Sequence, residues 1–341
     1  KSFRRVCVGC RLRHKYVRLI SVAVAMKVVA LVSGGKDSCF NLMLCEKFGH
    51  ELVALANLRP VDADHIQEID SYMYQTVGHN LVGAYAACTG LPLFRKKVYG
   101  SSKNLEKSYQ ETKGDEVEDL RALLRSVKRA MPEVGAVSCG AIRSDYQRVR
   151  VESVCESLGL VCLSYMWRQH QDKLLTSMIE QGVHAVLIKV ACLGLHPNKD
   201  LGKTIAQMQP KLRRLAEMYG VHICGEGGEY ETLTLDCPLF KHGRIVIDES
   251  HCELDDSGEN GNLVVDRFHI ERKDEEQQRP FGDDPSSSSQ IIDVDEEMNE
   301  GNRSPLVQDI QVKDSSAGRE EEKFISNDEC LKCVAEAELV E

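Results

Sequence analysis

The segment 28–44, VVALVSGGKDSCFNLML, constrains the fold more than any other part of the sequence. An apolar run leads into two glycines, and an amphipathic run follows directly. This order is typical of a strand, a tight turn and a helix, because glycine permits positive φ and close approach of a ligand. The first amides of a helix lack intrahelical partners, and the helix dipole favours negative charge there. The segment therefore predicts an anion site, with phosphate as its natural occupant.

The residues of the turn support phosphate as the ligand. Ser33 and Ser38 offer hydroxyl donors, Lys36 offers a positive charge, and Gly34 and Gly35 leave the backbone accessible. The alternative is a helix that is merely capped by Ser or Asp, but strand, turn, both serines and helix all agree on a phosphate loop. The order fits neither a Walker A loop nor a Rossmann GxGxxG motif.

Strand-like and helix-like segments alternate through residues 26–163. The pattern predicts strands at 27–32, 51–56, 92–98, 134–139 and 160–163, and helices at 38–48, 76–88, 115–131 and 144–158. The helix at 115–131 is the clearest, because its apolar residues have helical spacing and Pro132 ends it. Such alternation predicts an α/β fold, a Rossmann-like parallel sheet covered by helices on both faces.

A smaller α+β domain is expected at 164–270. Its pattern predicts helices at 171–181 and 202–219, the second interrupted by Pro210, and strands at 185–190, 232–235, 244–247 and 263–270. Residues 271–341 are acidic, contain Ser and Pro and have few aromatics, which predicts a disordered linker or tail. Residues 1–25 are a basic leader that we expect to be unfolded. Met26 is a plausible start, and a transit peptide is the alternative.

Composition limits the class of protein. The formal net charge is −10, which argues against a general nucleic-acid binder. No window approaches the roughly 18 apolar residues of a membrane span. The 14 cysteines are scattered, and the CxxC pairs Cys7/Cys10 and Cys330/Cys333 lie at opposite ends. This usage favours reduced, mostly buried thiols in a cytoplasmic protein over a zinc or redox role.

SGGKDS resembles the PP-loop of the ATP pyrophosphatase family, whose pattern is SGGxDS. Five further stretches narrow the resemblance: MYQTVGH at 73–79, GDEVEDLRALL at 114–124, GAIRSDYQRVRVESVCESLGL at 140–160, MWRQHQDKLL from Met166, and CGEGGEYETLTLDCPLF at 224–240. Together with the loop they are similar to the diphthine–ammonia ligase family. The resemblance covers about residues 26–240 and is far more specific than the PP-loop alone.

The resemblance implies an ATP-dependent amidation. The substrate would be diphthine, a modified histidine of translation elongation factor 2, and ammonium would supply the nitrogen. ATP would adenylate the carboxylate, and AMP and pyrophosphate would leave, with Mg²⁺ assisting. The first domain would bind adenine nucleotide and the second would help to form the cleft. Some eukaryotic members carry RidA-type domains, to which the acidic segment would lead.

The same resemblance, with the local chemistry, gives candidate site residues. Catalytic roles are expected for Lys36, Asp37, Glu229 and Glu231. Asp37 would shape the loop or contact Mg²⁺, or it is only a helix N-terminal acid. ATP would contact Ser33, Gly34, Gly35, Lys36, Asp37 and Ser38, and also Gly140, Ser144 and Arg148, which follow a predicted strand or lie on an ordinary charged helix face.

The turn EGGEYET is the expected substrate site, with Glu226, Gly227, Gly228, Glu229, Tyr230, Glu231 and Thr232. Its carboxylates suit a cation such as ammonium, Mg²⁺ or the trimethylammonium of diphthine. Strand alternation would place Glu229 and Glu231 on one side. Tyr230 would alternatively offer an aromatic face. An exposed acidic hairpin loop is the simpler interpretation.

Two rival functions stay open from the sequence. A PP-loop tRNA-modifying enzyme that adenylates a base would want a basic surface, and a thiolase would want paired cysteines, whereas Cys39 lacks an obvious partner. A non-enzymatic nucleotide sensor is the second rival. No glutaminase nucleophile is recognisable, so free ammonium is the expected nitrogen donor.

Overall fold

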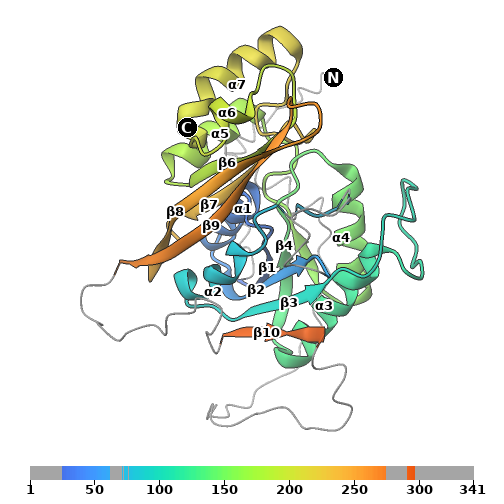
Figure 1. Cartoon of the computed structure of the whole chain (residues 1–341). Helices are drawn as coiled ribbons and strands as arrows, with labels where there is room; N and C mark the ends of the chain where they lie inside the picture. The colour runs from blue at the N-terminus through green and yellow to red at the C-terminus, as the bar shows by residue number, and fades with distance from the viewer. Residues whose placement is uncertain (1–24, 62–70, 72, 76, 274–289, 296–341) are drawn as a thin grey trace, which may run out of the picture.

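The computed structural model describes residues 25–61, 71, 73–75, 77–273 and 290–295, which form two sheets and their covering helices (Figure 1). The first sheet has the order β10-β3-β2-β1-β4-β5, and all of its pairings are parallel. Its strands are β1 (Lys27–Leu31), β2 (Glu51–Arg59), β3 (Leu93–Lys97), β4 (Val134–Ser138), β5 (Val161–Leu163) and β10 (Ile291–Asp293).

The strand order reverses beside β1, and this reversal places the helices. From β1 the chain moves outward to β2 and β3 through α1 (Lys36–Lys47), η1 (Leu81–Gly83) and α2 (Ala84–Thr89). It then returns through α3 (Glu116–Ala130) to β4 and through α4 (Asp145–Ser157) to β5. Because such crossovers are right-handed, the two directions put helices on opposite faces. The predicted α/β sheet is confirmed, with its switch point between β1 and β4.

Helix α3 shows why the sequence pattern was informative. The Asp115 side chain caps its start by accepting a hydrogen bond from the Val117 amide. Leu120, Leu123 and Leu124 are completely buried in the core beneath the sheet. Burial of each such leucine stabilises the fold by about 1.5–3 kcal/mol. The helical stripe of apolar residues therefore fixed both the element and the face that it buries.

The second sheet is antiparallel, with the order β7-β6-β9-β8. Its strands are β6 (His184–Val190), β7 (Tyr230–Asp236), β8 (Gly243–Leu254) and β9 (Gly261–Arg272), and its helices are α5 (Gln171–Glu180), α6 (Pro197–Asp200) and α7 (Ile205–Tyr219). Helices α5 and α7 pack on the sheet face that lies away from the parallel sheet (Figure 1). The expected boundary near Ser164 stays a prediction.

Both sheets share a core through α1 and α2. Leu42 of α1 and Tyr85 of α2 are buried together with Leu55 of β2, Ile188 of β6 and Leu233 of β7. Phe40, on another side of α1, packs into the cluster formed with α5 and α7. The helix that follows the glycine turn is therefore fixed between the two sheets.

The structure differs from the sequence prediction in two helices. The helix predicted at 76–88 is only η1 and α2, because Gly78 has a φ of +75° and residues 77–80 form a turn. The interruption predicted at Pro210 is wrong, since α7 continues through it. A capping box formed by Thr204 and Gln207, and the burial of Met208 and Leu212, hold this helix across the missing amide.

Part of the expected disordered tail is ordered. Residues 291–293 form β10 against the outer edge of β3, so the expectation of disorder does not hold at 290–295. The apolar Ile291 and Ile292 and the buried Val294 give this short segment an affinity for the edge. The basic leader and both CxxC pairs lie outside the described residues. Among the residues that the structure describes, no helix combines the length and apolarity that a bilayer crossing requires.

Candidate active site

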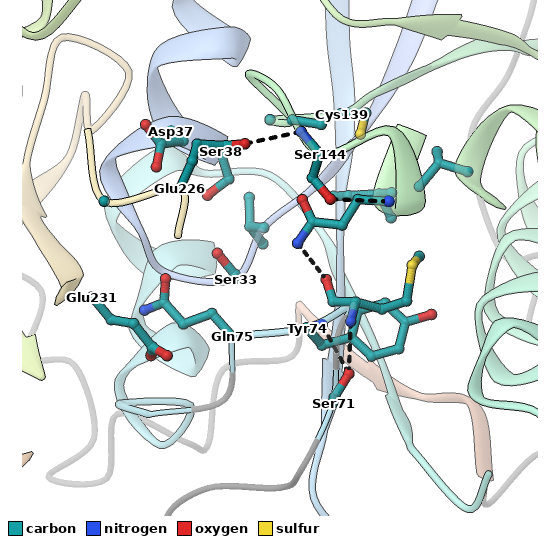
Figure 2. Close-up of a pocket in the computed structure, with 18 of the residues that line it drawn as sticks. Ser33, Asp37, Ser38, Ser71, Tyr74, Gln75, Cys139, Ser144, Glu226 and Glu231 are labelled. Carbon is teal, nitrogen blue, oxygen red and sulfur yellow. Dashed lines mark hydrogen bonds between the residues drawn. The ribbon is translucent and has the colours of Figure 1, made fainter. Parts of the chain in front are cut away.

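A cavity of about 600 Å³ lies at the carboxyl ends of β1, β2 and β4, where the strand order reverses. This volume falls in the range of small-molecule sites, about 300–1,000 Å³. Figure 2 shows the glycine turn and the 224–232 turn approaching it from different elements. Twelve predicted residues line it: Ser33, Lys36, Asp37, Ser38, Gly140, Ser144, Glu226, Gly227, Gly228, Tyr230, Glu231 and Thr232. Gly34, Gly35, Arg148 and Glu229 lie outside its lining.

The glycine turn has the geometry that its sequence predicted. Gly34 has a φ of +98°, and its carbonyl oxygen accepts hydrogen bonds from the Tyr85 hydroxyl at 2.8 Å and the Thr234 amide at 2.8 Å. A Cβ atom on Gly35 would lie 2.7 Å from Oε1 of Gln75. The first glycine is needed for its backbone angle and the second for space.

The first turn of α1 offers donors to the cavity. The Lys36 amide donates to Oγ1 of Thr232 at 3.1 Å, while the Ser38 hydroxyl donates to the Gly35 carbonyl at 2.9 Å. The amides of Asp37 and Ser38 also belong to the first turn, where helical geometry supplies no intrahelical acceptor. Both residues line the cavity. This end of the cavity therefore combines first-turn backbone amides with the positive end of a helix dipole, as an anion site requires.

Lys36 is an anchor within the protein. Its Nζ donates to the Cys224 carbonyl at 2.6 Å and to Oδ2 of Asp37 at 2.8 Å, and it lies 5.1 Å from the centre of the Tyr230 ring. Burial by itself lowers the pKa of Lys36, but the charge of Asp37 and the neighbouring Tyr230 and Cys224 raise it above its ordinary value. The lysine therefore stays charged and links the glycine turn to the 224–232 turn.

Asp37 has one oxygen engaged and one without a partner. Oδ2 pairs with Lys36, whereas Oδ1 is buried and has no hydrogen-bond partner among the described residues. Burial raises the pKa of this carboxyl, Lys36 lowers it and Glu226 raises it again, with a net rise. A buried carboxylate oxygen on a cavity wall without a donor is suited to a cation brought by a ligand.

Mg²⁺ fits this arrangement only together with a phosphate ligand. Among the described residues, no group of three or more His, Cys, Asp or Glu side chains could hold a metal. Mg²⁺ commonly binds through one or two carboxylates, substrate phosphates and water. Asp37 Oδ1 supplies one such oxygen.

Glu226 joins the 224–232 turn to the start of α4. Its carboxylate accepts hydrogen bonds from the amides of Ile142 at 3.1 Å, Arg143 at 2.8 Å and Ser144 at 3.0 Å. Ser144 in turn caps α4 by accepting from the Gln147 amide at 3.3 Å. Figure 2 shows Glu226 and Ser144 meeting at the cavity wall. A negative charge at a helix N-terminus is favourable, so Glu226 holds the turn in place.

The other residues of this turn have separate roles. Glu229 accepts from the amides of His222 at 2.7 Å and Gly227 at 2.8 Å, so it shapes its own loop. Tyr230 is buried, donates its hydroxyl to the Ile223 carbonyl at 2.6 Å and already has the Lys36 ammonium near its ring. Glu231 lines the cavity, 3.7 Å from the Lys189 ammonium. Strand alternation does not relate Glu229 to Glu231, because β7 begins at Tyr230.

Comparison with known proteins identifies the family. The family description "Diphthamide synthase N-terminal domain" matches residues 26–162, and "Diphthamide synthase C-terminal domain" matches residues 170–270. The chain is similar to proteins named diphthine–ammonia ligase: one from Danio rerio is 56% identical over 253 residues, 73% of this chain and 98% of the relative. One from Homo sapiens is 51% identical over 252 residues, 73% and 94%.

The chain belongs to the diphthine–ammonia ligase family.

Two further comparisons complete this finding. A diphthine–ammonia ligase of Schizosaccharomyces pombe is 55% identical over 240 residues, which are 70% of this chain but 39% of that longer protein. A solved structure from Methanocaldococcus jannaschii, titled as a predicted subunit of tRNA methyltransferase, covers 62% of this chain and 98% of its own at 14% identity and a TM-score of 0.30. At that score the likeness supports no argument.

The diphthine–ammonia ligase cavity also contains residues that the sequence did not single out. Gln75 donates to the Thr232 carbonyl at 2.9 Å, Tyr74 to the Glu116 carbonyl at 3.2 Å, and Gln147 to the Met73 carbonyl at 3.3 Å. Figure 2 shows Ser71, Tyr74 and Gln75 on a wall that also faces Ser33. The motif MYQTVGH was a signal for this wall, but nothing local to it predicted contact with β7.

Two predicted nucleotide contacts have other surroundings in the structure. The Arg148 guanidinium lies 4.4 Å from the centre of the Trp167 ring and pairs with Glu152 at 3.3 Å. Gly140 lines the cavity, and a Cβ atom there would lie 2.9 Å from the Ser38 amide nitrogen. Its lack of a side chain lets the end of β4 contact the first turn of α1.

Glu226→Gln is expected to loosen the cavity wall. Glutamine offers one acceptor oxygen in place of two charged ones, so the three amides of 142–144 lose part of their bonding. We expect a loss of about 1–3 kcal/mol in the free energy of unfolding, measured by urea denaturation. Glu259→Gln, in the exposed β8–β9 turn, removes the same charge as a control. Equal stability of the two variants would contradict the anchoring role.

Proposed function

We propose that the chain amidates diphthine on translation elongation factor 2 in the cytoplasm, with ATP as the energy source and free ammonium as the nitrogen donor. ATP transfers AMP to the diphthine carboxylate and releases pyrophosphate; ammonium then gives up a proton, and the resulting ammonia displaces AMP to leave diphthamide. The observation that carries the proposal is that a single cavity is lined both by the glycine turn and by the 224–232 turn. Membership of the diphthine–ammonia ligase family supports the same reaction.

The cavity has the parts that adenylation requires. Negative charge accumulates on the departing pyrophosphate, and donors fixed before the reaction stabilise it. The first-turn amides of Asp37 and Ser38 and the hydroxyl of Ser33 are such donors at one end. Lys36 contributes by holding the glycine turn against the 224–232 turn. Mg²⁺, bound through ATP phosphates and Asp37 Oδ1, would neutralise charge on the leaving group.

The acidic side of the cavity suits the other reactants. Ammonium and the trimethylammonium group of diphthine are both cations, and Glu231 places a carboxylate on the cavity wall. The glycine turn therefore binds the anionic nucleotide, and the 224–232 turn binds the cationic acceptor. Because the two motifs are separate, both reactants can occupy the cavity together.

Pyrophosphate release with three forms of elongation factor 2 tests this proposal. The chain, ATP and ammonium are incubated with the unmodified, the diphthine-bearing and the diphthamide-bearing factor. We expect release only with the diphthine form, together with the mass of the amide on the histidine by mass spectrometry. Release with no form would favour a nucleotide sensor. Turnover that requires glutamine would contradict free ammonium as donor.

Glu231→Gln is expected to separate amidation from ATP binding. Removal of a carboxylate weakens attraction for a cationic acceptor but does not weaken binding of anionic ATP. We expect kcat/KM for the diphthine-bearing factor to fall about ten-fold, equivalent to about 1.4 kcal/mol, while the Kd for ATP changes less than about two-fold. Glu259→Gln again serves as the control. An equal loss of both properties would remove Glu231 from the acceptor site.

The alternative, a PP-loop enzyme that adenylates a tRNA base, is not favoured by the comparisons, in which the named relatives are diphthine–ammonia ligases. The same assay distinguishes this alternative from the proposed reaction, because a tRNA-modifying enzyme would release pyrophosphate from ATP when tRNA is added without elongation factor.

A further inference from the structure

The outer edge of β3 carries buried positive charge. With residues 290–295 in place Lys96 has only 5% of its side chain exposed, and within residues 25–273 its recorded ion-pair partner is Asp119 at 3.5 Å. Arg95 of the same strand and Arg59 at the end of β2 lie on the opposite face of the sheet from Lys96. Burial, and then the charge of Arg59, lower the pKa of Arg95 to about 10, whereas Asp293 acts in the opposite direction. Buried cations are costly unless carboxylates accompany them.

The segment 290–295 supplies those carboxylates. Asp293 pairs with Arg59, and Oδ1 of Asp295 accepts from Lys96 Nζ at 2.9 Å. The second oxygen of Asp295 accepts from the Lys97 amide at 2.7 Å. Asp293 thus meets a cation of β2 and Asp295 a cation of β3, so the charges of the segment and of this side of the sheet are complementary.

Backbone pairing and apolar contacts add to the ion pairs. The Leu93 amide donates to the Gln290 carbonyl at 2.8 Å, and Ile291, Ile292 and Asp293 run parallel to 93–95. Val294 is 1% exposed and packs in the core cluster of α3, and Ile291 packs on the opposite face. An open strand edge is a template for such addition. Figure 1 shows β10 beside β3, at the edge of the parallel sheet.

We infer that the outer edge of β3 is a docking site for an acidic, β-branched strand, and that residues 290–295 of this chain are its occupant. The matched family domain ends at residue 270, so the docked segment is an addition to it. Because β10 is parallel to β3, Val294 and Asp295 lie at the carboxyl edge of the sheet. That is also the edge on which the cavity lies.

The double variant D293N/D295N of the full chain tests the docking by amide hydrogen exchange. We expect the amides of Leu93 and Lys97 to exchange at least about ten-fold faster than in the wild type, because the segment no longer covers them. The control D256N/E259Q removes two charges from the exposed β8–β9 turn and is expected to keep wild-type rates. Unchanged protection of Leu93 and Lys97 in D293N/D295N would overturn the inference.

A synthetic peptide of residues 288–297 tests the chemistry of the site. Added to D293N/D295N, it is expected to restore protection of Leu93 and Lys97, whereas a peptide with both aspartates replaced by asparagine is not. In the wild type the peptide should leave the protection of Leu93 and Lys97 unchanged, because the tethered segment has an effective concentration of about millimolar and outcompetes the peptide. Equal effects of the two peptides would contradict recognition of the acidic side chains. Protection of the wild type that falls on 100-fold dilution would contradict docking within one chain.

Discussion

Asp37→Asn is expected to lower kcat for pyrophosphate release about 10²–10³-fold, the range found when a preorganised electrostatic group is removed from an active site. Oδ1 of Asp37 is a buried carboxylate oxygen of a residue that lines the cavity, and the described residues give it no hydrogen-bond partner. The amide keeps the size of the side chain but loses its charge. Lys36 also loses its anionic partner, which weakens the link between the two turns.

A matched first-turn acid controls for helix effects. Asp145 is exposed at the first position of α4, as Asp37 is near the start of α1, and it does not line the cavity. Asp145→Asn should change kcat less than about two-fold, since surface substitutions away from special features have small effects. If Asp37→Asn behaves like Asp145→Asn, Asp37 is only a helix N-terminal acid. ATP titration by calorimetry shows whether the lost activity arises in binding or in turnover.

Gly140→Ala is expected to lower kcat/KM at least about 100-fold, since a displacement of about 1 Å at reacting groups is enough for such a loss. The added Cβ would lie 2.9 Å from the amide nitrogen and 3.0 Å from the Cα atom of Ser38. Both are backbone atoms of the first turn of α1, which is fixed between two sheets and cannot move aside. The end of β4 must therefore shift, and Ser144 shifts with it.

Gly135 offers a control within β4, the strand that precedes Gly140. A Cβ atom there would meet no atom within 4 Å, so Gly135→Ala should keep wild-type kcat/KM. Steady-state pyrophosphate release on the two variants makes the comparison, and circular dichroism confirms that both are folded. Normal turnover by Gly140→Ala would show that the contact between β4 and α1 does not position the site.

The local chemistry of the site could be predicted from sequence, because short-range rules govern it. The glycine turn, the cap at Ser144 and the amphipathic α3 each depend on residues within a few positions of one another. The parallel sheet followed from the alternation of strands and helices. Glu226 was expected at the site from the family resemblance together with its glycine-rich turn, whereas its contacts with the amides of 142–144 span more than 80 positions.

Contacts between distant segments could not be predicted. The sequence around Lys36 suggested that its ammonium binds phosphate. In the structure this ammonium donates to the Cys224 carbonyl, 188 positions away, and so is not free for a phosphate. Gln75 meets Thr232 across 157 positions. Such pairs depend on how β7 packs against α1, and periodicity carries no information about that packing. The strand at 291–293 escaped prediction for the same reason, since its stability comes from cations on β2 and β3.

The position of α1 between the two sheets limits how this enzyme can admit its substrates. Enzymes with separate lobes often open by rotation of one lobe about a hinge. Here such a rotation would pull Leu42 and Phe40 out of cores on both sides of one helix. For the protein substrate that we propose, access must therefore come from rearrangement at the cavity mouth, and the contacts between the two sheets are kept.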